Sequence, residues 1–163
     1  MTAGADAGAG SPGQEEAAFH GAKLVLVHDG QLLTYLRDDR PGLPFPACWD
    51  LPGGGREGDE SPLDCALREL REEFGLTLPP SRLVGRSFAS IRHPGWRSWL
   101  FTGQLNAAEI AAIRFGDEGQ EWRMMPLADF AAHPRAVPQF RALVRELIAA
   151  PPRPVPAGAA RRP

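Results

Sequence analysis

Three glutamates stand close together on a stretch of sequence that predicts a helix. Glu69, Glu72 and Glu73 are spaced i, i+3 and i+4, which places their side chains on an arc about 100° wide. Like charges at this spacing cost about a few tenths of a kcal/mol per pair. Carboxylate oxygens are the hard ligands that Mg²⁺ prefers, and Mn²⁺ accepts them too. The pattern therefore predicts a divalent metal site that acts on phosphate.

The residues before these glutamates supply a loop and a clamp. Gly53-Gly54-Gly55 permits positive φ torsions and lets the backbone approach a ligand closely. Arg68 precedes Glu72 by one helical turn and can also reach back to Glu60 at the start of the helix. A guanidinium fork that holds carboxylates in place is typical support for metal ligands. We therefore expect Arg68 and Glu60 to assist catalysis by orienting the metal-binding acids.

The spacing from the glycines to the end of the helix resembles the Nudix box, Gly-x5-Glu-x7-Arg-Glu-U-x-Glu-Glu-x-Gly-U, in which U is aliphatic. The matching residues are Gly54, Glu60, Arg68, Glu69, Leu70, Glu72, Glu73, Gly75 and Leu76. The chain therefore resembles a Nudix hydrolase at every fixed position. This resemblance implies an α/β/α sandwich with a mixed β-sheet and Mg²⁺-dependent hydrolysis of a nucleoside diphosphate linked to a group X. The residues of the box recognise the diphosphate, and they do not identify X.

The resemblance also implies roles for individual residues. The carbonyl of Gly53 is expected to join the three helix glutamates in the metal shell, and Glu72 to take part in catalysis. Glu118-Gly119-Gln120 followed by Glu121-Trp122 resembles a segment of MutT-type enzymes, with a shorter gap before the tryptophan. In those enzymes the first glutamate crosses to the metal site. Glu118 is therefore expected as a ligand or as the base that activates water, with Glu121 as the alternative.

Substrate contacts are expected on both sides of the glycine loop. Arg37 resembles an arginine that contacts phosphate or base in many family members, and Gly54-Gly55 should border the substrate. MutT-type enzymes read oxidised guanine with an asparagine after an Asp-Phe pair, but none follows Asp129-Phe130; His133 or Arg135 could read a purine edge instead. A nucleoside triphosphate, such as an oxidised or non-standard dNTP, is favoured over nucleotide sugars, ADP-ribose and dinucleoside polyphosphates. The aromatic residues available to stack on a base are Phe45, Trp49, Phe88, Trp96 and Trp99.

Two other classes of function remain open. A Nudix-fold binding module without catalysis has no need for three mutually repelling acids. An isomerase on the same scaffold, as in isopentenyl diphosphate isomerases, needs a catalytic cysteine, and Cys48 is the only residue that could serve. Cys65 falls inside the motif helix, where a small packing residue is expected.

The elements that position these residues can be read from turn and capping signals. Ser61 is the predicted N-cap, Pro62 the first helical residue and Gly75 the C-cap, so the motif helix is predicted over 62–74. Few helices among several strands favour a mixed sheet with helices on both faces. Strands are predicted over 19–28, 31–36, 82–92, 96–105 and 121–125, and further helical segments over 107–115, 127–132 and 137–149.

Length and composition predict one domain with two tails. Residues 17–150 are expected to form the Nudix domain, whereas 1–16 and 151–163 cannot bury enough apolar surface and are expected to be disordered. The 18 Lys and Arg residues against 20 Asp and Glu include no long basic run, which disfavours a nucleic-acid polymer as partner. No signal peptide or membrane span is visible. A cytoplasmic monomer or homodimer acting on a small nucleotide is expected, with reduced thiols.

Overall fold

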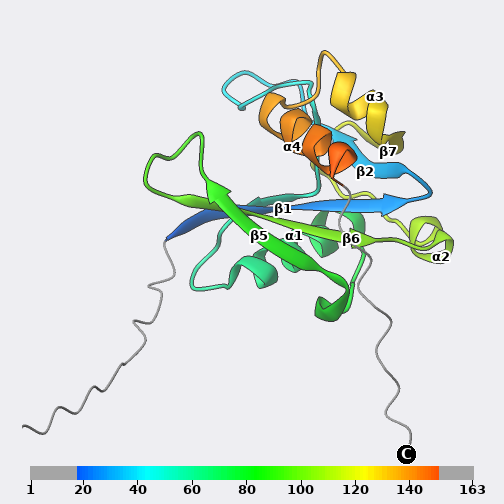
Figure 1. Ribbon diagram of the computed structural model, residues 1–163, viewed down its shortest axis with the longest axis horizontal. Coiled ribbons are helices and arrows are strands. Elements are labelled where there is room, and N and C mark those ends of the chain that lie inside the picture. Colours follow the sequence, from blue (N-terminus) through cyan, green and yellow to red (C-terminus); the bar gives the residue numbers. More distant parts are fainter. Residues whose placement is uncertain (1–17, 151–163) are drawn as a thin grey trace, which may run out of the picture.

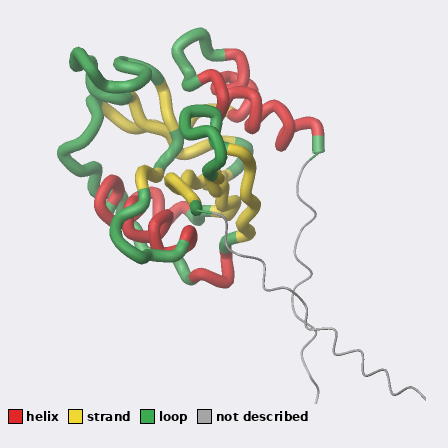
Figure 2. Tube along the Cα trace, turned by 90° about the vertical axis from the view of Figure 1, so that its left-hand side faces the viewer, coloured by secondary structure: helices red, strands yellow, loops and turns green. Residues whose placement is uncertain are grey.

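A mixed β-sheet with helices on both faces forms the body of the protein (Figure 1). The computed structural model describes residues 18–150, so the tails predicted at 1–16 and 151–163 lie outside the described residues. Figure 2 shows the strands between helical segments on opposite sides. The predicted fold class is thereby confirmed.

The described residues contain seven strands and four α-helices. The strands are β1 (Phe19–His28), β2 (Gln31–Leu36), β3 (Trp49–Asp50), β4 (Gly53–Gly55), β5 (Val84–Ala89), β6 (Arg97–Gln104) and β7 (Glu121–Pro126). The helices are α1 (Pro62–Phe74), α2 (Ala107–Ala111), α3 (Leu127–Ala132) and α4 (Pro138–Ala149), with a 3-10 turn at Pro80–Arg82. None of the helices within 18–150 combines the length and the apolar character that crossing a bilayer requires.

The strand β1 contributes to two hydrophobic cores, one on each face of the sheet. Ala22, Leu24 and Leu26 pack in the core that includes α1, whereas Val25 packs in the core that includes α3 and α4. Successive side chains of a strand point to opposite faces. Lys23 therefore shares a face with Val25, and its ammonium lies 5.6 Å from the ring centroid of Phe140 on α4.

β1 and β2 separate soon after the turn that joins them. Their antiparallel register joins only Val27 to Leu32 and His28 to Gln31. Farther from the turn, β4 pairs with Gly21–Lys23 of β1, while β7 and β3 pair with β2. β6 runs parallel to β1 along its other edge. The two strands thus diverge like a fork, and their separation leaves room for the pocket described below.

The motif helix α1 has the predicted ends. The Ser61 hydroxyl accepts a hydrogen bond from the Asp64 amide at 3.1 Å, and Gly75 adopts a left-handed conformation with φ of 66°. Leu70 and Phe74 are buried against the sheet, which turns the neighbouring face of the helix toward β4. The prediction for this helix, residues 62–74, is confirmed.

Two departures from the expected elements matter for the site. The triple glycine forms β4, although glycine weakens a strand, because its backbone pairs closely with β1. The helix expected over 107–115 ends at Ala111, because the following segment bonds to the end of α1 instead. The amides of Arg114 and Gly116 donate to the carbonyls of Phe74 and Glu73 at 2.9 and 2.8 Å. This turn leads the chain into the loop that carries Glu118.

Candidate active site

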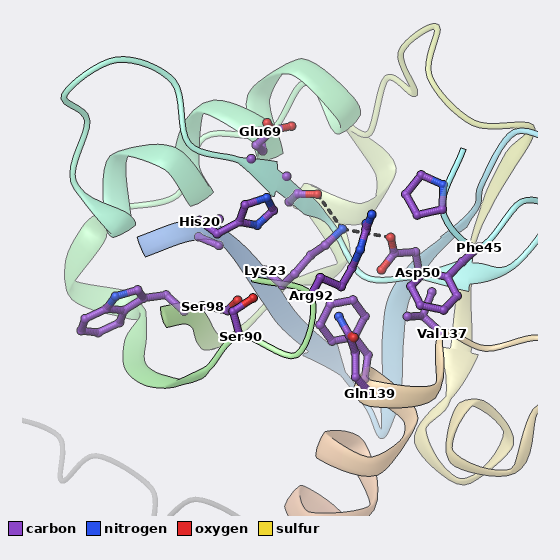
Figure 3. Close-up of a pocket in the computed structure, with 18 of the residues that line it drawn as sticks. His20, Lys23, Phe45, Asp50, Glu69, Ser90, Arg92, Ser98, Val137 and Gln139 are labelled. Carbon is purple, nitrogen blue, oxygen red and sulfur yellow. Dashed lines mark hydrogen bonds and ion pairs between the residues drawn. The ribbon is translucent and has the colours of Figure 1, made fainter. Parts of the chain in front are cut away.

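A pocket of about 310 Å³ opens in the fork between β1 and β2 (Figure 3). Acidic side chains of β3, α1 and the loop before β7 line it together with basic side chains of β1, of the segment after β2 and of the loop between β5 and β6. The charged residues that line it are Lys23, Arg37, Asp50, Glu69, Glu73, Arg92 and Glu118. Carboxylates that repel one another thus share a cavity with basic side chains. This mixture of charges suits a phosphate ligand together with its counterion.

Glu73 is the most deeply buried acid of the motif. Only 6% of the residue is exposed, and its Oε2 accepts a hydrogen bond from the Gly53 amide at 2.8 Å. Burial raises the pKa of Glu73 to about 8, the nearby Glu69 and Asp50 add to the shift, and Lys23 opposes it. The carboxylate is therefore short of positive charge in the protein by itself.

Glu69 lies against the glycine loop at the same end of the pocket (Figure 3). A Cβ at Gly54 would come within 2.5 Å of its Oε1, so only glycine leaves room for this carboxylate. Burial raises the pKa of Glu69 and Arg68 opposes the rise. Two neighbouring carboxyls with raised pKa values fit a cation that neutralises both.

The other predicted acids lie in different surroundings. Glu118 lines the pocket, as does Gly53, whereas Glu72, with 54% of its side chain exposed, is not among the lining residues. Glu121 points elsewhere and pairs with Arg123 at 3.0 Å. Among residues 18–150, no three acidic, histidine or cysteine side chains are gathered closely enough to hold a metal ion. The protein ligands of a cation are therefore few, and phosphate oxygens and water would complete its shell.

Arg68 holds Glu60, Glu69 and Glu72 together, and of these Glu69 lines the pocket. Its Nε and one terminal nitrogen donate to both oxygens of Glu60, at 3.0 and 2.8 Å, and further bonds reach the Gly55 carbonyl, Glu69 and Glu72 at 2.9, 2.9 and 3.0 Å. Only 14% of the side chain is exposed. The bonds from Arg68 lower the pKa of Glu60 to about 2. Arg68 thus connects the loop to three acids of the helix region, in the position that its spacing suggested.

A buried ionic network lies at the floor of the pocket and was not predicted from the sequence. Asp50, whose side chain is 3% exposed, accepts hydrogen bonds from Lys23 at 3.0 Å and Arg37 at 2.9 Å through the same oxygen. The Tyr35 hydroxyl lies 3.4 Å from that oxygen. The network joins β1 to β2 across the fork. A charged residue inside the apolar run of β1 was the signal that could have identified it.

Only aromatic residues that line the pocket can stack on the base of a bound nucleotide. Trp96 lies outside the lining and is 46% exposed, and Trp49 is buried in the core that includes α4. His133 and Arg135, the residues considered for reading a purine edge, are also outside the lining. The aromatic and amide residues that do line the pocket are Tyr35, Phe45, Phe88, Trp99, Gln139 and Phe140.

Neither cysteine is placed for catalysis. Cys65 is fully buried in α1, and burial raises the pKa of its thiol to about 12, which suits a packing residue. Cys48 packs against the core that includes α3 and α4 and does not line the pocket. We therefore expect Cys48→Ala to keep kcat/KM within about twofold of the wild-type value, measured by phosphate release. A loss of tenfold or more would instead place Cys48 in the catalytic machinery.

The backbone at Gly53 predicts a large and local effect on stability. Gly53 has φ of 119°, and a Cβ there would lie 2.2 Å from the Ala22 carbonyl oxygen. Gly58 has φ of 52° but open space around it. Gly53→Ala should therefore lower the free energy of unfolding by about 3 kcal/mol or more, against about 1 to 2 kcal/mol for Gly58→Ala. Urea denaturation of both variants checks this, and equal losses would contradict it.

Comparisons with known proteins identify the family and the fold. A family model described as NUDIX domain matches residues 18–147. A curated RNA pyrophosphohydrolase from Xylella fastidiosa (strain M12) is 29% identical over 110 residues, which are 68% of this chain and 51% of that protein. The chain thus spans about half the length of the curated relatives it matches.

Solved structures share the fold. A MutT protein from Methanosarcina mazei Go1 matches with a TM-score of 0.65 at 21% identity, over 83% of this chain and 96% of that one. A bifunctional NMN adenylyltransferase/ADP ribose pyrophosphatase from Francisella tularensis matches with a TM-score of 0.64 at 20% identity, over 82% of this chain and 42% of that one. Because the family model covers nearly all described residues, and Gly54, Glu69 and Glu73 of the box line one pocket, the chain belongs to the family of the NUDIX domain, the Nudix hydrolases.

Proposed function

We propose that the protein hydrolyses a diphosphate bond of a nucleoside diphosphate linked to a further group, with a nucleoside triphosphate as the favoured substrate. One observation carries the proposal: Glu69, Glu73 and Glu118 share a single pocket with Lys23 and Arg37. An acidic end suits a cation bound to the diphosphate, and a basic end suits the phosphate charge that remains. The products would be a nucleoside monophosphate and pyrophosphate.

Nudix hydrolases generally need a divalent metal, and we propose Mg²⁺, with Mn²⁺ able to replace it. Glu69, Glu73 and Glu118 all line the pocket, and because the three are not gathered around one point, two of them at a time would hold the ion, with phosphate oxygens and water completing its shell. When bound, such an ion neutralises phosphate charge and lowers the pKa of a bound water. Glu72 lies outside the lining, and the Gly53 carbonyl already accepts a hydrogen bond from Lys23.

The protein's own side chains would bind the substrate, accept the proton and position the acids. Arg37, held against Asp50 at 2.9 Å, would contact a phosphate oxygen at the basic end. Glu118, which enters from a loop, would take the proton of the attacking water. Arg68 and Glu60 would keep the α1 acids in place without touching substrate. The aromatic wall formed by Phe45, Phe88 and Phe140 would stack on the base and exclude water.

A second candidate substrate is the 5′-triphosphate end of an RNA. The names of the curated relatives support it, because those proteins are RNA pyrophosphohydrolases. The chemistry at the phosphorus is the same, so the same acids serve both candidates. The formal net charge of -2 and the lack of a long basic run favour the free nucleotide.

A substrate panel with Mg²⁺ tests the proposal. The compounds are the common and 8-oxo nucleoside triphosphates, a 5′-triphosphorylated oligoribonucleotide, a nucleotide sugar, ADP-ribose and diadenosine tetraphosphate. We expect the highest kcat/KM for a free nucleoside triphosphate, with pyrophosphate as product. Higher turnover of the oligonucleotide would select the second candidate. Binding of nucleotides with no turnover of any compound would leave a non-catalytic binding module.

A further inference from the structure

Lys23 is the only lysine in the chain. The chain has 18 lysine and arginine residues, and all of them except Lys23 are arginines. Lys23 lies in the middle of β1. Its side chain is only 15% exposed. A compact ammonium is therefore used at this position on the pocket floor, next to the guanidinium of Arg37, and the geometry gives a reason for this choice.

The Lys23 ammonium uses all three of its donors on acceptors of the neighbouring segment, and Figure 3 draws its contact with Asp50. Nζ lies 2.6 Å from the Gly53 carbonyl oxygen, 3.0 Å from the Leu51 carbonyl oxygen and 3.0 Å from Oδ2 of Asp50. Three acceptors around one point make a site for a small cation. A planar guanidinium cannot satisfy that arrangement, because its donors lie in one plane.

The shortest of these contacts involves the carbonyl that the sequence assigned to the metal. A divalent ion on the Gly53 oxygen would lie about 2.1 Å from it. Nζ is 2.6 Å from the same oxygen, so the two positive centres would be at most about 5 Å apart. At that separation the repulsion between a single and a double positive charge exceeds the worth of a hydrogen bond. Lysine and metal therefore exclude each other at this oxygen.

The charges around Lys23 are only partly balanced: Lys23 and Arg37 pair with Asp50, whereas Glu73 forms no ion pair within residues 18–150. The buried carboxylates on this side of the pocket are Asp50 and Glu73, and the cations facing them are Lys23 and Arg37. Glu69 shares Arg68 with other acids. Glu118 makes no ion pair within the described part of the chain. The acidic charge still to be neutralised thus lies on Glu69, Glu73 and Glu118.

We propose that the Lys23 ammonium is a resident cation at the Gly53 carbonyl and takes the place of one metal ion there. The pocket then takes a divalent ion only on the side of Glu69, Glu73 and Glu118. The proposal rests on the proposed function for the presence of a metal site, but it concerns how many ions the chain binds. It also explains why the basic residue here is lysine.

Binding of Mn²⁺ alone, without nucleotide, tests the proposal by calorimetry and by electron paramagnetic resonance of free Mn²⁺. Lys23→Met should bind one more Mn²⁺ per chain than the wild type at millimolar Mn²⁺. Arg56→Met, which removes a positive charge from the exposed loop after β4, is the matched control and should leave the number unchanged. The same number in Lys23→Met as in the wild type, or fewer, would overturn the proposal.

A second measurement uses the wild-type chain and so does not depend on a variant that folds. Protein labelled with ¹³Cε-lysine gives one lysine signal, because the chain has one lysine. We expect this signal to stay at the position of a buried, bonded ammonium when Mg²⁺ saturates the protein. A shift to the position of a free lysine would show displacement by the metal and overturn the proposal. Since neither measurement uses substrate, a failed hydrolysis assay would not affect them.

Discussion

Glu73→Gln is expected to abolish turnover and, at the same time, to make the metal-free protein more stable at neutral pH. The proposed ligand would lose its charge, so kcat should fall by about 10² to 10³-fold. Glutamine can still accept the hydrogen bond from the Gly53 amide, which Glu73 accepts at 2.8 Å. The fold therefore keeps its contact and no longer has to bury a group that is ionised in the unfolded chain at neutral pH.

The stability gain has a defined pH range. The pKa of Glu73 rises from 4.5 to about 8 on folding, because the charged form is buried. Below pH 4.5 the group is protonated in both the folded and the unfolded chain and costs nothing. As pH rises from about 4.5 to 8, the unfolded chain loses the proton first and the wild-type protein loses stability. The full shift corresponds to roughly 5 kcal/mol as an upper bound.

Urea denaturation in EDTA from pH 5 to 8.5, paired with turnover assays in Mg²⁺, measures both effects. Glu72→Gln is the matched control for stability, because Glu72 is adjacent in the helix but 54% exposed. It should change the free energy of unfolding by less than about 0.5 kcal/mol. A Glu73→Gln protein that kept turnover would refute the role of this acid, and one that bound nucleotide as before without metal would indicate a binding module.

Arg68→Met is expected to reduce both stability and activity, because one guanidinium serves five acceptors. Glu60 and Glu69 are each less than 15% exposed and would be left without their partner. Breaking such a partly buried set should cost about 2 to 4 kcal/mol. Loss of orientation at the proposed ligands should lower kcat/KM by about 10 to 100-fold. Arg68→Lys should show the same losses, since the point charge of an ammonium cannot replace the planar array of donors of a guanidinium.

Arg71→Met provides the control on the same helix. Arg71 is exposed and has no ion pair among residues 18–150, so its loss should cost little. Acid titration adds a second readout. Because Arg68 holds the pKa of Glu60 at about 2, the wild-type pair is fully stabilising above pH 4.5 and weakens as pH falls toward 2. The stability difference between the wild type and Arg68→Met should shrink over that range, and a constant difference would contradict the pairing.

Local signals in the sequence were sufficient for the motif helix and the hairpin. Ser61 and Gly75 set the ends of α1 through backbone hydrogen bonds that involve only neighbouring residues. Asp29-Gly30 set the turn between β1 and β2 in the same way. The spacing of the box also placed Arg68 within reach of Glu60 and Glu72. Each of these features extends over one or two helical turns or one tight turn. A sequence pattern describes contacts over that range.

The composition of the pocket depended on contacts between distant segments. Lys23, Arg37 and Asp50 meet only because β1 and β2 diverge and β3 crosses between them, and no local pattern encodes that meeting. For the same reason, the turn that ends α2 early is held by carbonyls of α1. The sequence by itself determined the family, the motif helix and its acids. Only the tertiary structure decided which acids face the pocket and that an ammonium holds the Gly53 carbonyl, because burial and long-range pairing set those contacts.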